Sequence, residues 1–326
     1  MSSRRHALLA LPVLAALALA GCAAPAETDT GSDADGLRIV AVTDVYGDIA
    51  ERVAGDSAEV TSLITSAAQD PHSYEATARD RLAVQKADIV IRNGGGYDDF
   101  LTTLLPAAGG PLVLDVVALS EHAAEAEEAE AGHEEDGDHG HEGHGHEGHD
   151  HGAFNEHVWY DLAAVDALAT ALRDELSTRA PESAATVTAG YDALHGELQS
   201  LQARVEAMSA DATGREILAT EPVPLYLFAD LGLANRTPEA FSAAVEAGSD
   251  VSPALVKETL DILRGGQIAF LAVNLQSAGA EVESLRTAAS DAGIGVVDFS
   301  ETLPEGEDYL SWMTLNLDRI AEALAA

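Results

Sequence analysis

The sequence predicts an α/β protein of two lobes, each with a parallel sheet flanked by helices, joined by one long helix. Two patterns support this prediction. Short apolar segments rich in β-branched residues alternate with amphipathic segments on both sides of the chain's middle, which is typical of parallel sheets. Between these stretches, residues 181–212 carry one unbroken helical periodicity. A chain of 326 residues, 47% of them hydrophobic, is long and apolar enough for two ordinary domains.

The first lobe is expected over residues 37–180. Apolar segments predict strands at residues 38–42, 59–64, 88–91 and 112–114, and amphipathic segments predict helices at 47–54, 77–87 and 161–178. Three glycines at positions 94–96 follow the third strand. They lack the lysine and the spacing of a phosphate-binding loop, so they predict only a tight turn from strand to helix.

Residues 121–151 interrupt this pattern. Apart from alanines near its start, the segment has no apolar side chains to bury, and it predicts a disordered insertion on a surface loop. Its histidines are His133, His139, His141, His144, His146, His149 and His151. Closely spaced, flexible imidazoles bind zinc, copper or nickel weakly, so we expect an auxiliary weak metal-binding loop. The alternative is a solvated acidic linker without a task.

The long linking helix is expected over residues 181–212. Its apolar positions recur at alternating spacings of four and three, which places one stripe along a helix of roughly 40 Å. The stripe consists of Val187, Tyr191, Leu194, Leu198, Leu201, Val205 and Met208. Too few heptads are present to favour a coiled-coil dimer, so we expect a monomer with this helix laid across a globular body. His195 lies near the stripe and is interpreted as a structural residue rather than a ligand.

The second lobe, residues 213–326, repeats the alternation of the first. Strands are expected at residues 216–219, 267–273 and 295–299, and helices at 222–231, 253–264, 281–292 and 308–325. Ser252 is placed to cap the second of these helices.

The N-terminal residues predict export and lipid anchoring. Arg4 and Arg5 precede an apolar run at residues 7–20 that is too short to span a membrane. Leu-Ala-Gly-Cys at 19–22 then resembles the lipobox of bacterial lipoproteins. We therefore expect a signal peptide at residues 1–21, lipidation of Cys22, and a flexible tether at 22–36. The two arginines are compatible with export by the Sec pathway and with export by the twin-arginine pathway.

Charge narrows the choice of partners. The formal net charge is −39, and no basic patch is visible, so nucleic acid is excluded as an expected partner. Cys22 is the only cysteine, so no intramolecular disulfide can form.

Two short motifs each place one histidine in an ordered context. The first is Asp-Pro-His-Ser-Tyr-Glu at 70–75, and the second is Asn-Glu-His-Val-Trp-Tyr-Asp at 155–161. Imidazole nitrogens and carboxylate oxygens are ligands that zinc and manganese accept.

The lipobox, these motifs, the histidine-rich segment and the long helix together resemble the zinc- and manganese-binding solute-binding proteins of bacterial ABC importers. The resemblance covers the chain from about Leu37 to its end. It implies a metal site in the cleft between the lobes, with His72, His157, Glu221 and Glu301 as ligands. Asp298 is a second choice for the fourth ligand.

The same resemblance implies a function. The protein is expected to be anchored outside the cytoplasm, to capture zinc and to deliver it to the permease of an ABC transporter. Histidine-rich loops accompany the zinc members of the family, whereas Glu221 replaces a histidine found in many zinc importers. Manganese (or iron) is therefore the alternative cargo.

Elementary chemistry agrees with such a site. Two neutral imidazoles and two carboxylates balance a divalent cation and allow four to six coordination. Glu156 stands where the family has a proline, which we interpret as a change in loop stiffness. Asp161 is expected either to accept the second ring proton of His157 or to cap the following helix.

Other function classes compete. A metallohydrolase would need an open coordination position and a nearby base, but the sequence has no His-Glu-x-x-His pair, and a fourth carboxylate would close the site. We therefore expect no enzyme activity. A surface adhesin or metal buffer would instead work through the lipid anchor and the acidic loop.

Overall fold

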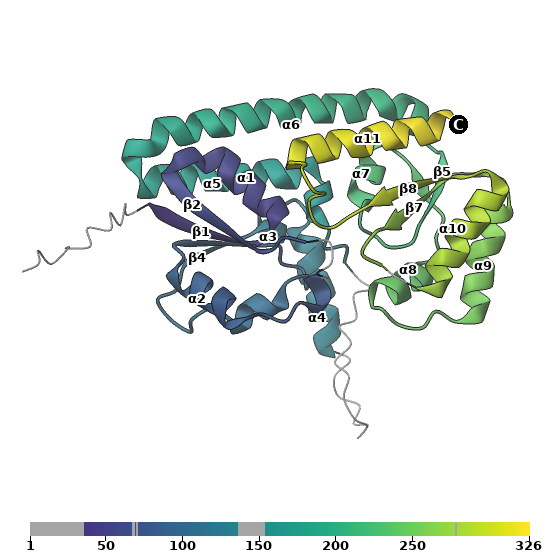
Figure 1. The fold of residues 1–326 in the computed structure, drawn as a ribbon, viewed down its shortest axis with the longest axis horizontal. Coiled ribbons are helices and arrows are strands. Elements are labelled where there is room, and N and C mark those ends of the chain that lie inside the picture. The colour runs from purple at the N-terminus through teal and green to yellow at the C-terminus, as the bar shows by residue number, and fades with distance from the viewer. Residues whose placement is uncertain (1–35, 67–68, 70, 136–153, 278) are drawn as a thin grey trace, which may run out of the picture. The chain divides into compact units, whose positions relative to one another are not determined.

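The computed structural model describes residues 36–66, 69, 71–135, 154–277 and 279–326. The predicted signal peptide, Cys22, most of the tether and all predicted loop histidines except His133 lie outside the described residues. Within the described part, the chain forms two parallel four-stranded sheets and one long helix (Figure 1). The predicted fold class is confirmed. None of the helices in the described ranges is both long enough and apolar enough to cross a membrane.

The first sheet has the strand order β2-β1-β3-β4. Its strands are β1 (Leu37–Thr43), β2 (Ala58–Ile64), β3 (Ile89–Arg92) and β4 (Leu112–Asp115). The pairing is parallel throughout, with Ile39 opposite Val60 on one side and Ile89 on the other. Figure 1 shows α1 (Asp44–Ala54) and α5 (Leu162–Arg179) between this sheet and the long helix, and α2 (Ala78–Lys86) on the other face.

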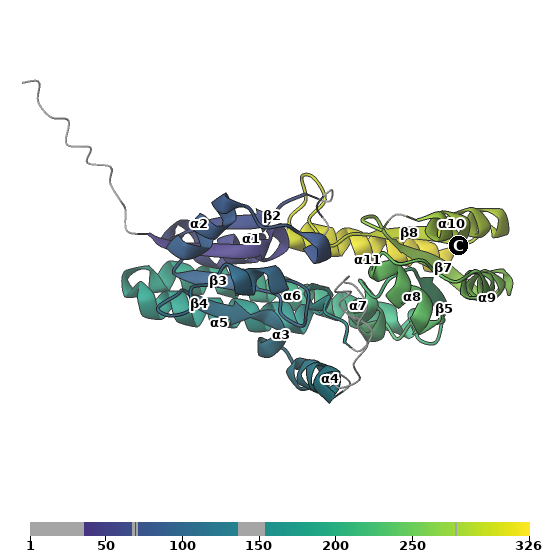
Figure 2. The same ribbon diagram turned by 90° about the horizontal axis from the view of Figure 1, so that it is seen from below.

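The second sheet has the equivalent order β6-β5-β7-β8. Its strands are β5 (Glu216–Ala219), β6 (Ala234–Asn235), β7 (Ile268–Asn274) and β8 (Gly295–Phe299). The helices of this lobe are α7 (Leu225–Asp230), α8 (Glu239–Glu246), α9 (Pro253–Arg264), α10 (Ala280–Ala292) and α11 (Tyr309–Ala325). α7 and α11 lie on the side of the long helix, and α9 and α10 on the opposite side (Figures 1 and 2).

The long helix is α6 (Ala184–Ala212), and it runs beside both sheets (Figure 1). The predicted stripe faces inward, because Val187, Leu194, Leu198, Leu201 and Val205 are buried. The helix packs against α1 and α5 of the first lobe and against α11 of the second. Burial of each large apolar side chain contributes about 1.5–3 kcal/mol, so this stripe is a main source of the attachment between the lobes.

A single apolar core also connects the lobes near their middle. Trp159, Tyr160, Tyr309 and Trp312 belong to it and are almost completely buried. Tyr160 donates its hydroxyl proton to the carbonyl of Ser300 (2.8 Å), and Tyr309 donates to the carbonyl of Trp159 (2.7 Å). These bonds fix the segment around residue 157 against the second lobe.

The structure departs from the predicted elements in two regions. The segment 121–151, expected to lack structure, contains α4 (Ala123–Glu135), and α3 (Val116–Leu119) precedes it. Alanine and glutamate favour helix even where few side chains can be buried, which the argument from apolar content overlooked. The strand β6 and the helix α8 were also missed. A strand of two residues carries no periodicity to detect, and α8 lies in a stretch rich in small residues.

Candidate metal centre

His72 lies in a 3₁₀ turn, Pro71–Ser73, between β2 and α2. Its side chain is 13% exposed, and its ring meets that of Tyr97 edge-on at a centroid distance of 5.1 Å. Pro71 fixes the backbone of the turn, and the buried Tyr97 holds the imidazole from one side. The histidine is therefore oriented by packing in the first lobe.

His157 is completely buried just before the 3₁₀ turn Val158–Tyr160. Its Nδ1 lies 2.8 Å from Oδ1 of Asn155, so Nδ1 carries the ring proton and the lone pair is on Nε2. The segment is held from both lobes. Asn93, after β3, donates to the carbonyl of Glu156 (2.8 Å), and Asn155 donates to the carbonyl of Pro222 (3.2 Å).

Asp161 does not take the second proton of His157. Its carboxylate instead accepts from the backbone N–H of Ala163 (2.8 Å), which caps α5, and lies 3.0 Å from Nε2 of His122. Of the two expected roles, capping is the one observed. The acceptor for His157 is Asn155, two residues before it, because the tight turn brings that amide beside the ring.

The second lobe presents its polar groups at the carboxyl ends of neighbouring strands. Glu221 follows β5, Asn274 ends β7 and Glu301 follows β8. Asn274 donates its amide protons to both carboxylates, with a length of 2.8 Å to Oε1 of Glu301. In open parallel sheets ligands bind at this edge. Asn274 therefore holds the two acids in fixed relative positions, and the sequence analysis had missed it.

Glu301, rather than Asp298, faces the histidines. Asp298 lies within β8 and pairs with Arg286 (2.6 Å) at the half-exposed surface. Glu301 is 3% exposed, and its Oε2 accepts from the hydroxyl of Tyr97 (3.3 Å). Oε2 also lies 3.8 Å from Nε2 of His72.

Three of the four predicted residues converge in one place. His72, His157 and Glu301 each offer one ligand atom, and these atoms all lie within 4.8 Å of one another. Glu221 is connected to this group through the shared amide of Asn274. We call His72, His157, Glu221 and Glu301 the metal centre. Two imidazoles from the first lobe thus meet two carboxylates from the second.

Two further glutamates that the sequence analysis did not assign lie against this centre. Oε1 of Glu156 is 3.7 Å from Nδ1 of His72, and Oε1 of Glu246, on α8, is 3.9 Å from Nδ1 of His157. Their side chains are 1% and 3% exposed. The interpretation of Glu156 as a change in loop stiffness was incomplete, because its buried carboxylate also faces a histidine. The position of Glu156 next to His157 in the motif could have indicated that it lies at the site. The sequence around Glu246 contains no such indication.

The electrostatics of the centre are dominated by crowded acids. Burial raises the pKa of the Glu246 carboxyl to about 10, and the charges of Glu156, Glu221 and Glu301 add to the shift. Burial, followed by the charge of Glu301, also raises the pKa of Tyr97 well above its usual value. Such a group of carboxylates stabilises a divalent cation, which replaces the repulsion between the acids by attraction.

Two other histidines from the sequence analysis, His195 and His133, lie in described helices. His195 pairs with Asp166 (2.7 Å) on the surface of α6, which agrees with its interpretation as a structural residue. His133 lies in the last turns of α4.

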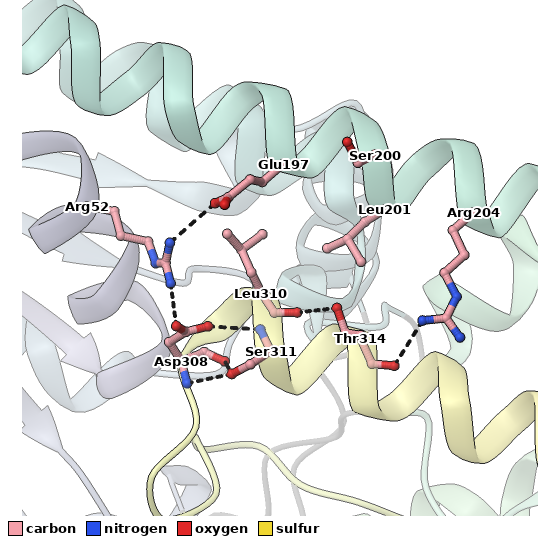
Figure 3. Close-up of a pocket in the computed structure, with 9 residues that line it drawn as sticks. All are labelled: Arg52, Glu197, Ser200, Leu201, Arg204, Asp308, Leu310, Ser311 and Thr314. Carbon is pink, nitrogen blue, oxygen red and sulfur yellow. Dashed lines mark hydrogen bonds and ion pairs between the residues drawn. The ribbon is translucent and has the colours of Figure 1, made fainter.

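A cavity of about 480 Å³ is lined by residues of α1, α6 and α11 (Figure 3). No residue of the metal centre lines it. Arg52 and Arg204 face it, and both are paired with acids, so the cavity is not a second assembly of metal ligands.

Comparison with known proteins places the chain among metal-binding transport proteins. Residues 39–323 match the family described as "Zinc-uptake complex component A periplasmic". A manganese ABC transporter substrate-binding lipoprotein of Streptococcus gordonii is 25% identical over 329 residues, covering 97% of this chain and 98% of that protein.

Solved structures show the same fold. The periplasmic zinc-binding protein TroA of Treponema pallidum aligns with a TM-score of 0.67 at 20% identity, covering 89% of this chain and all of that one. The solute-binding protein FpvC of Pseudomonas aeruginosa, solved with Mn²⁺, aligns with a TM-score of 0.65 at 21% identity, covering 89% and 98% of the two chains.

Proposed function

The chain belongs to the family of periplasmic zinc-uptake complex component A, and on that premise we propose that its metal centre captures zinc and delivers it to the permease of an ABC importer. The protein is a substrate-binding component of a metal transporter and not an enzyme. One observation supports the assignment of the site above all others: His72, His157 and Glu301 bring ligand atoms from both lobes within 4.8 Å of one another.

In this proposal, Nε2 of each histidine and the carboxylates of Glu221 and Glu301 bind the cargo ion. Asn155 keeps the lone pair of His157 on Nε2, and Asn274 orients both carboxylates. Such partners of the ligands fix their geometry and tune affinity. Because each lobe supplies two ligands, binding of the ion favours the arrangement in which the lobes are close together.

Zinc is the first candidate and manganese the second. Affinity for a given set of nitrogen and oxygen ligands rises from manganese to zinc, and two imidazoles favour zinc. Glu221 adds a hard oxygen, which favours manganese, and the relative from S. gordonii is named as a manganese transporter protein.

The proposal includes the protein's place in the cell. Lipidation of Cys22 would anchor a monomeric protein outside the cytoplasm, close to its permease. The histidine-rich segment would bind ions weakly and raise their concentration near the lobes. These expectations rest on the N-terminal and loop sequences.

The function is tested by elemental analysis of the purified protein, followed by competition between zinc and manganese. We expect one tightly bound zinc per chain, which manganese in modest excess fails to displace. A strain lacking the protein should grow poorly in zinc-depleted medium and recover with added zinc. Recovery with manganese alone would reverse the choice of metal, and a protein that holds no tightly bound divalent ion would contradict the function.

A further inference from the structure

A second set of ligands lies beside the metal centre and shares one residue with it. His72, Glu156 and Glu246 each offer a ligand atom, and these three atoms also lie within 4.8 Å of one another. The two nitrogens of His72 face different neighbours: Nε2 is 3.8 Å from Glu301, and Nδ1 is 3.7 Å from Glu156. The imidazole therefore stands between two groups of carboxylates.

The chemistry of imidazole makes these two sets alternatives. A neutral ring has one lone pair, and its other nitrogen carries the proton. One ion can therefore be held through Nε2 or through Nδ1, but two ions bound at once would require removal of the remaining ring proton, which would leave an imidazolate. A single cation thus has two adjacent positions available to it.

The surroundings of Glu246 are a second, independent observation that favours a cation between His72, Glu156 and Glu246. Its side chain is 3% exposed, and among the described residues no hydrogen-bond donor reaches its Oε1. A buried carboxylate oxygen without a donor is costly, and a metal ion directed at it would remove that cost.

A cavity connects Glu246 with the surface. It has a volume of about 210 Å³, and its lining combines apolar residues with polar residues, among them Asn155, Thr237, Glu239 and Glu246. Glu239 is exposed at the start of α8, and Glu246 ends the same helix. One acidic side chain therefore lies near the mouth of the cavity and another at its inner end. The volume is sufficient for a small cation with several of its waters.

We propose that Glu156, Glu246 and Nδ1 of His72 form a staging site, reached through this cavity, from which a divalent cation passes to the metal centre. The inference rests on the proposed function and adds a route to it. The staging site offers two oxygens and one nitrogen, so it accepts zinc and manganese alike, and discrimination falls to the centre with its two imidazoles.

The test follows zinc binding by stopped-flow fluorescence of the full-length protein. The ring of Trp159 lies 5.1 Å from that of His157, so its emission reports on the cleft. Glu246→Gln and Glu156→Gln should each slow association by about tenfold or more, because glutamine cannot release a proton to become a charged ligand of the entering ion. Dissociation should slow in proportion, since the same route leads outward, and the equilibrium constant should change far less. Glu258→Gln, an exposed change of equal charge on α9, is the matched control.

Two results would overturn the staging site. One is an unchanged association rate in both glutamine variants. The other is a large loss of affinity at an unchanged association rate, which would make these glutamates ligands of the metal centre itself.

A second arm isolates the staging site. His157→Ala weakens the metal centre but leaves the second set intact. Weak zinc-dependent quenching of Trp159 should therefore persist in this variant. It should disappear in the double variant that also carries Glu246→Gln. Residual quenching that survives the second change would contradict the inference. If wild-type protein showed no zinc-dependent signal at all, the proposed function would fail first, so the two failures are distinguishable.

Discussion

The metal centre and the cluster around Arg52 both collect charged side chains from the two lobes, but they balance their charges differently. In and beside the metal centre, four buried glutamates face two imidazoles, and burial raises the pKa of Glu246, one of these glutamates, to about 10. The guanidinium of Arg52, on α1, pairs with Asp48 of the same helix. It also pairs with Glu197 of α6 and with Asp308, which caps α11 (Figure 3). The second cluster is complete without any ligand, whereas the first, in our proposal, is completed by a divalent cation.

The two clusters also differ in how much of their charged side chains is exposed to solvent. The side chains of Arg52 and Asp308 are 27% and 43% exposed, so water screens their attraction. Glu301 and His157 are almost or completely buried, where electrostatic interactions are stronger. We therefore expect the Arg52 cluster to hold the lobes together weakly in every state, and the metal centre to hold them together strongly once a metal ion is bound.

The largest expected effect is loss of metal binding when an imidazole is removed. His157→Ala and His72→Ala should each lower zinc affinity by more than about 100-fold, because they delete a ligand rather than one of its partners. Titration calorimetry measures the affinity, and circular dichroism should remain nearly unchanged. His195→Ala is the control. If it lowered affinity equally, the assignment of the centre would be wrong.

Zinc should stabilise the folded protein by about 4 kcal/mol at a thousandfold excess over its Kd. The physical reason is that only the folded chain brings ligands from both lobes together. Thermal unfolding with and without zinc measures this effect. His157→Ala should abolish most of it, whereas Arg52→Ala should leave it in place, since the Arg52 cluster does not touch the ion.

Asn274→Ala should lower zinc affinity by about 10–100-fold without deleting a ligand. Its amide orients both Glu221 and Glu301, and removal leaves two buried carboxylates to repel each other. Asn235→Ala, at the exposed strand β6 of the same lobe, serves as the comparison. Unchanged affinity in Asn274→Ala would show that the carboxylates hold their positions without it.

Arg52→Ala should lower the free energy of unfolding by about 1 kcal/mol, and less at high salt. The ion pairs to Asp48, Glu197 and Asp308 are lost, but the most buried of these acids, Asp48, still accepts a hydrogen bond from the backbone N–H of Tyr309. Urea unfolding at two salt concentrations measures the change. A loss several times larger would mean that the two clusters resemble each other more than their exposure suggests.

The last expected effect concerns pH and a carboxyl group at the boundary of the lobes. Burial raises the pKa of Asp44 to about 6, although the N–H of Leu303 in the other lobe donates to its carboxylate. The folded state therefore prefers the protonated acid. Its contribution to stability is complete below pH 4 and is lost as the pH rises through 6.

Asp44→Asn should consequently be more stable than wild type at pH 7.5 by about 1–3 kcal/mol, and the difference should vanish near pH 3.5. Chemical unfolding in the presence of a chelator keeps the metal centre out of the measurement. Asp56→Asn, an exposed change close by in the sequence, should show no such trend. An advantage of Asp44→Asn that grew as the pH fell would contradict the prediction.

The sequence by itself determined the architecture and the histidines. Strand and helix periods predicted both sheets and the long helix, because side chains that face a core repeat with the geometry of their own element. His72 and His157 stood out for a similar reason, since each lies in a short motif whose neighbours in the chain fix its turn. Glu221 and Glu301 followed from the family resemblance, and the structure places both at the carboxyl ends of strands.

Only the tertiary structure decided which other groups surround these residues. Asn274 and Glu246 reach the site from the end of β7 and the end of α8, and no local pattern marks them, because their neighbours at the site are distant in the chain. The structure also showed that Glu301 faces the histidines, whereas Asp298 pairs with Arg286 at the surface. It showed as well that Asn155, and not Asp161, accepts the hydrogen bond from the ring N–H of His157. A local motif determines the backbone turn in which a residue lies. The electrostatic potential and the hydrogen bonds around that residue depend on all the segments that folding brings next to it.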